Sequence, residues 1–171
     1  MKRKYIFWLI LTLPALLLIG TDYGYALSRS GVTAAVFVLA TLAAPHVRRW
    51  FPGLMCHRRA IGVAAFGYSA LHLTIYLSRK WPEALDAATG QDLLTGWIAF
   101  VIYAALAVTS RDKAVRAMGP RWKRLHKLTW AASALLAAHW VLSAFDPLVG
   151  WLFAGAVAGL WLLGRVRRRR A

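Results

Sequence analysis

Six long windows without Asp, Glu, Lys or Arg divide this chain of 171 residues. Each window is 17 to 19 residues long, and together they cover residues 5–21, 30–47, 60–78, 93–110, 128–145 and 147–164. At about 1.5 Å per helical residue, each would cross roughly 25 to 28 Å, close to the ~30 Å hydrocarbon core of a bilayer. The windows predict an all-α membrane bundle of six transmembrane helices, in a single domain over residues 1–171.

The composition supports a membrane setting over a soluble one. Hydrophobic residues make up 60% of the chain and the mean hydropathy is +0.51. The net charge of +16 would suggest nucleic acid in a soluble protein. Here the cations lie between apolar windows, which indicates contact with membrane lipids and no nucleic-acid partner.

The distribution of charge predicts the orientation. Nineteen of the 22 Lys and Arg residues fall on one side of the six windows, whereas the other side holds three cations and five of the six acids. By the positive-inside rule, both termini are then cytoplasmic. A second reading takes the first window as a secretory signal cleaved near Gly24, Tyr25 and Ala26, which would leave five helices in the same orientation.

Two histidines lie deep within the predicted membrane region. His72 is 13 residues beyond Arg59 and His139 is 12 beyond Lys127, so both imidazoles lie about 18 to 20 Å from the cytoplasmic edge. Ionisable groups at such depth are costly and count as functional candidates. Their common depth predicts a pair of axial haem ligands on the third and fifth spans.

Small residues around these histidines would leave room for a porphyrin. The alternative is that they let helices pack closely while each histidine bonds across helices or relays protons, as in a transporter or assembly scaffold. A zinc or copper site would need a third ligand at this depth, and Cys56 is the only cysteine. The flanking small residues are Gly62, Ala64, Ala65, Gly67, Ser69, Ala70, Ala131, Ala132, Ala134, Ala137 and Ala138.

The cytoplasmic end of the fifth span offers a candidate for a second cofactor site. His126 lies 13 residues before His139, about 20 Å away along the helix axis. Its candidate partners are His57 or Arg58, near the start of the third span. An interfacial histidine in a basic loop also needs no special role, and His46 is read as a head-group contact.

Five sequence segments carry a family resemblance. Their order resembles that of the MsrQ (YedZ) family, part of the ferric-reductase-like transmembrane group that includes the NADPH oxidases. The match runs from about Pro45 to Ala144, and Arg121 to His126 is its most specific piece. The segments are RRAIG from Arg58, LHLTIY from Leu71, LAVTS from Leu106, MGPRWKRLHKLTW from Met118 and AAH from Ala137.

The resemblance implies a function. A b-type haem would carry electrons from a cytosolic flavin reductase across the bacterial inner membrane to a periplasmic molybdenum-cofactor subunit that reduces methionine sulfoxide in proteins. The chain would be an electron-transfer subunit and not the substrate-converting one. His72 and His139 match the family's outer haem ligands, and His126 matches its inner histidine. A second haem and a flavin, FMN, would compete for the region around His126.

The chain departs from the wider group in two respects. On the third span, the oxidases have a second histidine about four helical turns before the one that His72 matches. This chain has Arg58 and Arg59 at that place, and His57 lies one residue earlier. It also lacks a nucleotide-binding domain after the last helix, so we expect a separate protein to supply the reductant. A ferric reductase or quinone-linked cytochrome b with another partner is the alternative within redox proteins.

Overall fold

The computed structural model describes residues 11–80, 91–143 and 147–169, and within these ranges every regular element is a helix. A helical turn at residues 11–16 precedes α2 (Tyr23–Val47), the short α3 (Pro52–Cys56) and α4 (Arg58–Lys80). The chain continues with α6 (Gln91–Val108), α7 (Asp112–Met118), α8 (Pro120–His126), α9 (Leu128–Leu142) and α10 (Pro147–Arg169). The all-α prediction is confirmed for this part of the chain.

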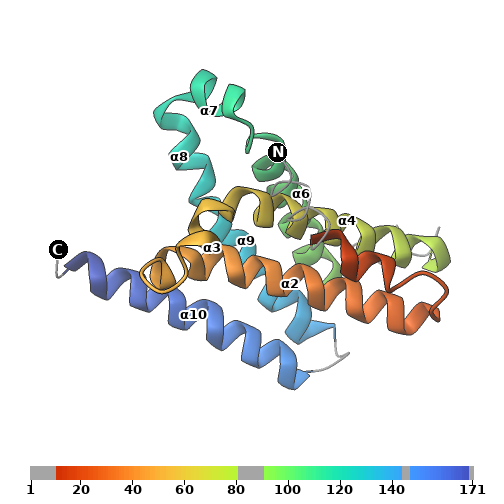
Figure 1. Ribbon diagram of the computed structural model, residues 1–171. Helices are drawn as coiled ribbons and strands as arrows, with labels where there is room; N and C mark the ends of the chain where they lie inside the picture. The colour runs from red at the N-terminus through yellow and green to blue at the C-terminus, as the bar shows by residue number, and fades with distance from the viewer. Residues whose placement is uncertain (1–10, 81–90, 144–146, 170–171) are drawn as a thin grey trace.

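Local sequence signals explain where several helices begin and end. The Asp22 carboxylate accepts a hydrogen bond from the Tyr25 backbone N–H at 2.9 Å and so caps the start of α2. Gly119, at a φ of +51°, separates α7 from α8, and Pro120 then occupies the first turn of α8. α7 and α8 form a hairpin that stands away from the other helices (Figure 1).

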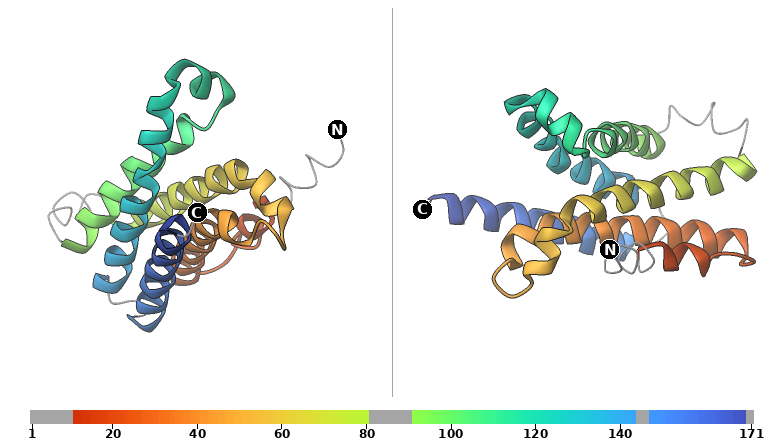
Figure 2. Two further views of the ribbon diagram at one scale, coloured as in Figure 1. Left: turned by 90° about the vertical axis from the view of Figure 1, so that its left-hand side faces the viewer. Right: turned by 45° about the horizontal axis from the view of Figure 1, so that its top comes forward.

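Two antiparallel helix pairs form the body of the protein. α2 packs along α4, α6 packs along α9, and α10 covers α9 and part of α2. Figure 2 shows that α6 is seen nearly end-on in a view where α2, α4 and α10 lie across the page, so the two pairs cross at a steep angle. Their shared core includes the buried residues Val38, Leu42, Ala65, Ala99, Ala132, Phe153 and Val157.

The outer surface is apolar enough to require a lipid environment. On α10, Leu148, Trp151 and Leu152 each expose about two-thirds of their surface. Soluble proteins rarely expose contiguous apolar surface on this scale. Within the described residues, Tyr23–Val47, Arg58–Lys80 and Pro147–Arg167 are long and apolar enough to cross a membrane. Leu93–Val108 adds a fourth span when taken together with α7, which bends away from it by 94°.

The predicted windows and the observed helices differ in places. The fifth window, 128–145, contains α9, which ends at Leu142, and residues 144–146 lie outside the described part. The first window, 5–21, is described from residue 11 and is helical only to residue 16 before a turn. The Tyr68 hydroxyl on α4 donates to the Leu11 carbonyl at 2.9 Å and accepts from the Ala15 N–H at 2.8 Å. This side chain thereby holds the first segment against α4.

Candidate functional site

His72 lies on α4 against the N-terminal half of α2. Its Nδ1 is 2.9 Å from the Leu27 backbone carbonyl and 3.4 Å from Ser30 Oγ. Because a carbonyl oxygen only accepts, Nδ1 carries the proton and Nε2 keeps its lone pair. Histidines that bind metals commonly donate their other ring N–H to a backbone carbonyl in this way. The imidazole is therefore prepared to offer Nε2 as a ligand.

A glycine on the neighbouring helix lies against each deep imidazole. A Cβ placed at Gly31 on α2 would lie 3.1 Å from His72 Nδ1, and one at Gly96 on α6 would lie 2.8 Å from His139 Nδ1. Each helix pair thus presents a histidine on one helix and a glycine on the other. An alanine at Gly96 would force a shift, since Cβ atoms do not approach ring atoms to 2.8 Å.

The two deep histidines belong to different helix pairs. His72 on α4 and His139 on α9 are close enough for an electrostatic interaction between their imidazoles. Both side chains are partly buried. Two imidazoles from different helices are the donor set that a bis-histidine haem requires.

The small residues before His139 divide between two surfaces. Ala132 and Ala137 are buried in the core, as close helix packing requires. Ala131, Ala134 and Ala138 line an apolar groove of about 700 Å³ against α10, together with Trp130, Trp151 and Trp161. Ala137 borders this groove as well as the core. This groove does not include His72 or His139, so it is separate from the histidine pair.

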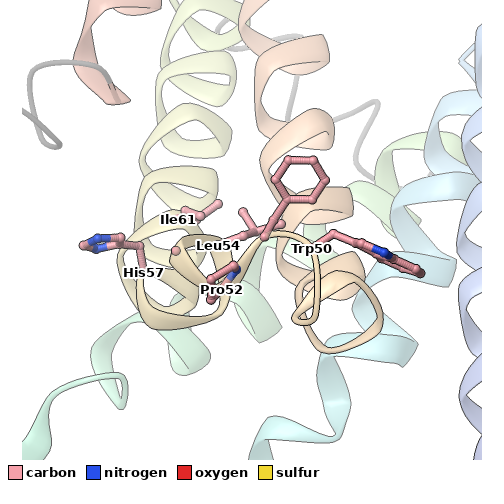
Figure 3. A pocket seen from close by; sticks show the side chains of 7 residues that line it. Trp50, Pro52, Leu54, His57 and Ile61 are labelled. Carbon is pink, nitrogen blue, oxygen red and sulfur yellow. The ribbon is translucent and has the colours of Figure 1, made fainter.

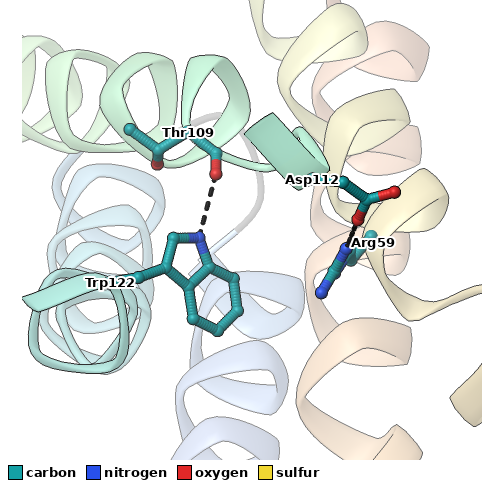
Figure 4. A network of polar contacts seen from close by, with 4 residues as sticks. All are labelled: Arg59, Thr109, Asp112 and Trp122. Carbon is teal, nitrogen blue, oxygen red and sulfur yellow. Dashed lines mark hydrogen bonds and ion pairs between the residues drawn. The ribbon is translucent and has the colours of Figure 1, made fainter. Parts of the chain in front are cut away.

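His126 belongs to a polar cluster, here called the inner cluster from the predicted orientation, between the end of α6, the start of α4 and the α7–α8 hairpin. Its Nε2 is 3.1 Å from Thr109 Oγ1, and its ring stacks on Trp122 with centroids 4.0 Å apart. The Trp122 indole N–H donates to the Thr109 carbonyl at 2.9 Å, and Arg59 lies over the indole while pairing with Asp112 (Figure 4). The cluster ties the α7–α8 hairpin to α4 and α6.

Burial and nearby cations lower the pKa of His126. Partial burial is the larger cause, and the charges of Arg58 and Arg59 add to it. The imidazole is therefore neutral near pH 7, as a metal ligand or hydrogen-bond acceptor must be. Thr109 Oγ1 donates to the Ala105 carbonyl at 2.7 Å, so it accepts from His126 Nε2–H and leaves Nδ1 with the lone pair.

The proposed partners of His126 behave differently from each other. Arg58 turns toward α2, where its Nε donates to the Thr41 carbonyl at 2.8 Å, and it lies near enough to His126 to affect its charge. His57 instead lines a pocket of about 460 Å³ at the α3 loop. In Figure 3, His57 and Trp50 point to opposite sides of this loop. Arg58 thus interacts with both Thr41 of α2 and His126.

His46 is engaged with the last helix. Its ring packs against Gly164 of α10, where an added Cβ would lie 3.4 Å from the ring, and its backbone carbonyl accepts from Arg167 at 3.1 Å. This placement accounts for His46 by helix packing at the end of α2. Arg58, which interacts with His126, also lies near enough to His46 to interact with it electrostatically.

Comparison with known proteins shows which family this chain belongs to. The family described as ferric reductase like transmembrane component matches residues 7–138. The protein-methionine-sulfoxide reductase heme-binding subunit MsrQ of Bordetella pertussis is 36% identical over 157 residues, covering 83% of this chain and 75% of that protein. The chain belongs to the MsrQ family. MsrQ of Rhizobium meliloti is 33% identical over 148 residues, covering 80% of this chain and 68% of its own length.

Another relative, matched over a shorter segment, has a different name. The magnetosome protein MamZ of Magnetospirillum gryphiswaldense is 37% identical over 94 residues, which cover 52% of this chain but 14% of MamZ. No solved structure matches this chain. The predicted membership of the MsrQ family is confirmed, and with it a multi-pass membrane protein of the ferric-reductase-like class.

Several residues of this MsrQ-family site escaped the sequence reasoning. Ser30, Gly31 and the Leu27 carbonyl surround His72, and Gly96 lies against His139. Thr109 pairs with His126. A serine inside an apolar window was one available signal for Ser30, and the four-residue spacing of Trp122 and His126 predicts a shared helix face. The glycine contacts depend on long-range packing and had no local signal.

Proposed function

We propose that this chain is a membrane b-type cytochrome that binds haem between His72 and His139 and passes electrons through the membrane. The observation that carries the proposal is the hydrogen bond from His72 Nδ1–H to the Leu27 carbonyl, which leaves Nε2 available to iron, together with the convergence of His139. Haem iron would supply the one-electron redox chemistry. The protein would supply the two imidazoles and a low-dielectric surrounding.

A non-haem metal site is less well supported by the residues. Among the described residues, no group of three or more His, Cys, Asp or Glu side chains could hold a metal ion. Zinc and copper sites generally need three or four such donors, whereas haem iron needs one or two axial ligands from the protein. The names of the MsrQ relatives, which describe a heme-binding subunit, support the same choice.

We also propose the finer topology and the route of the electrons. Six spans in a single domain with both termini cytoplasmic are supported by the charge-free windows and by the position of 19 cations on one side. In the bacterial inner membrane, a cytosolic flavin reductase would supply electrons and a periplasmic molybdenum-cofactor subunit would accept them. The sulfoxide chemistry would then take place on the partner subunit.

The inner cluster is proposed as a second cofactor site. His126, with Arg58 nearby, would bind a second haem or FMN. Nε2 of His126 is hydrogen-bonded to Thr109, and Trp122 covers one face of the ring. A haem iron would therefore bind Nδ1, or Thr109 would have to give up its hydrogen bond to Nε2. We therefore expect the outer haem to be the tighter and more constant of the two cofactors.

Cofactor stoichiometry on the purified full chain tests the proposal. Haem is measured by pyridine haemochrome and flavin by fluorescence after extraction. At least one non-covalent haem b per chain is expected, with a Soret band that survives purification. A protein that shows no Soret band after expression with added haem would overturn the proposal.

A further inference from the structure

Ser30 is a fully buried hydroxyl within the apolar α2 helix. Its exposed fraction is 0%, and its Oγ donates to the Leu27 carbonyl one turn earlier at 2.9 Å. The same oxygen lies 3.4 Å from Nδ1 of His72 on the facing helix. A polar side chain in this position touches both the ring and the carbonyl that the ring contacts.

The three groups together allow only one proton arrangement. The Leu27 carbonyl can only accept, so it requires a proton on His72 Nδ1. The Ser30 proton is already directed at the same carbonyl, so Ser30 Oγ also faces Nδ1–H with a lone pair. Both contacts therefore favour the Nδ1–H tautomer, in which Nε2 is unprotonated.

Packing limits the ring further. The ring lies against Gly31, the residue after Ser30, where an added Cβ would be 3.1 Å from Nδ1 and 3.2 Å from Cε1. Residues 27, 30 and 31 of α2 thus contact the same edge of the imidazole. These contacts fall on Nδ1 and Cε1, and the tautomer that they favour keeps the lone pair on Nε2.

We infer that Ser30 is a positioning residue for His72, and this inference rests on the proposed haem function. Ser30 Oγ and the Leu27 carbonyl accept hydrogen bonds from Nδ1–H of His72 and so hold the ring in the Nδ1–H tautomer. Acceptors at Nδ1–H make the imidazole a stronger electron donor through Nε2, which favours ferric over ferrous iron. The hydroxyl of Ser30 therefore helps to set both the direction of the ligand and the midpoint potential of the outer haem.

The test compares Ser30→Ala and Ser30→Cys with Ser133→Ala in the full chain in nanodiscs. Ser30→Cys keeps most of the volume but forms weak hydrogen bonds, so it separates the loss of the bond from a cavity. Ser133 is also 0% exposed, but its hydroxyl donates to the Thr129 carbonyl and lies 3.0 Å from the Tyr103 hydroxyl. It is thus a matched buried serine on α9.

Two readouts are used. In haem-free protein, 15N NMR of labelled histidine reports the His72 tautomer, with the signal assigned by its loss in His72→Ala. We expect the Nδ1–H form in the unmodified chain and in Ser133→Ala. In both Ser30 variants the Leu27 carbonyl is the one remaining acceptor of the two, so we expect a measurable increase in the share of the Nε2–H form. In haem-loaded protein, we expect both Ser30 variants to raise the midpoint potential and shift the low-spin electron paramagnetic resonance signal, while Ser133→Ala matches the unmodified chain.

The outcomes separate this inference from the proposed function. A chain that binds haem through His72 but whose tautomer and potential are unchanged by both Ser30 variants would overturn the role of Ser30 alone. A chain that binds no haem would overturn the proposed function, while the tautomer measurement would still report on Ser30 directly. Equal shifts in Ser133→Ala and the Ser30 variants would indicate a general packing effect and would also contradict the inference.

Discussion

His139 on α9 lies directly against Gly96 on α6, so closely that a methyl group at Gly96 would come within 2.8 Å of the imidazole Nδ1. Gly96→Ala would gain about 0.5 to 1 kcal/mol of helix propensity. Forcing a methyl group into a packed contact costs about 1 to 3 kcal/mol. This steric cost should exceed the gain in helix propensity. We predict that Gly96→Ala displaces the His139 ring and lowers the low-spin haem content several-fold, as measured by absorption at equal protein.

A second glycine substitution controls for helix effects. Gly155 on α10 is exposed, and an added Cβ there meets nothing within 4 Å. Gly155→Ala should leave haem content unchanged and the protein as stable as before or slightly more so. Normal haem content in Gly96→Ala would mean that the close contact does not position His139.

The pH response of the inner cluster gives another prediction. Burial, with Arg58 and Arg59, lowers the pKa of His126 below 6.5. The folded state therefore favours the neutral imidazole of His126. The stability that this preference contributes is present above pH 6.5 and is lost as the pH falls from 6.5 toward the lowered pKa. We predict that Arg59→Gln raises this pKa toward its ordinary value, as measured by NMR titration of His126.

Arg116→Gln serves as the matched loss of a cation for this titration. Arg116 is an exposed residue of α7 and is not among the groups that shift His126. Its substitution should leave the titration midpoint in place. If Arg59→Gln left the midpoint unmoved as well, the coupling between α4 and the His126 cluster would be disproved.

The basic segment that contains α7 and α8 is predicted to dock the electron donor. Its seven cations lie beside His126 in the hairpin that stands away from the bundle (Figure 1). Positive charge of this kind steers acidic or phosphate-bearing partners. Reversing Arg116, Arg121 and Lys123 to Glu should slow reduction by a flavin reductase at least several-fold at low salt, and the difference should narrow as salt rises.

The alternative role for these cations is adhesion to the membrane surface. Reversing the exposed cations Arg48, Arg49 and Arg169 changes the charge of the same predicted face by the same amount. That control should retain most of the reduction rate. Equal rates in the two triple variants across a range of salt would favour membrane adhesion over docking.

The position of the deep histidines also predicts the direction of electron flow. His72 and His139 lie near the predicted outer ends of α4 and α9, with eight residues from His72 to Lys80 and three from His139 to Leu142. We expect a membrane-impermeant oxidant to reoxidise the haem quickly from the periplasmic face of oriented vesicles. Fast reoxidation from the cytoplasmic face alone would show that the topology or the ligands are wrong.

Sequence reasoning reached the parts of the site that depend on spacing along a helix. The common depth of His72 and His139 was predicted from their distances to Arg59 and Lys127, and the two imidazoles interact electrostatically in the structure. The bend of 94° after α6 was not predicted, because a charge-free window carries no signal for the direction of the chain beyond it. Whether the six windows are six spans stays a prediction.

The surroundings of the histidines depend on which helices pair. The Leu27 carbonyl and His72 are 45 residues apart, and Gly96 and His139 are 43 apart. Such contacts arise from the close packing of α2 with α4 and of α6 with α9. Small residues in the windows indicated that close packing would occur, but they did not identify the partner helix or its register.

The most direct test of the central claim is the haem spectrum of three histidine variants. His72→Ala and His139→Ala should each abolish the six-coordinate low-spin spectrum, because each removes one of the two proposed axial ligands. His46→Ala should leave it intact, since His46 packs against Gly164 of α10. Absorption and electron paramagnetic resonance of the purified variants, at equal protein and haem, provide the measurement. A full six-coordinate low-spin spectrum in His72→Ala or His139→Ala would contradict the account.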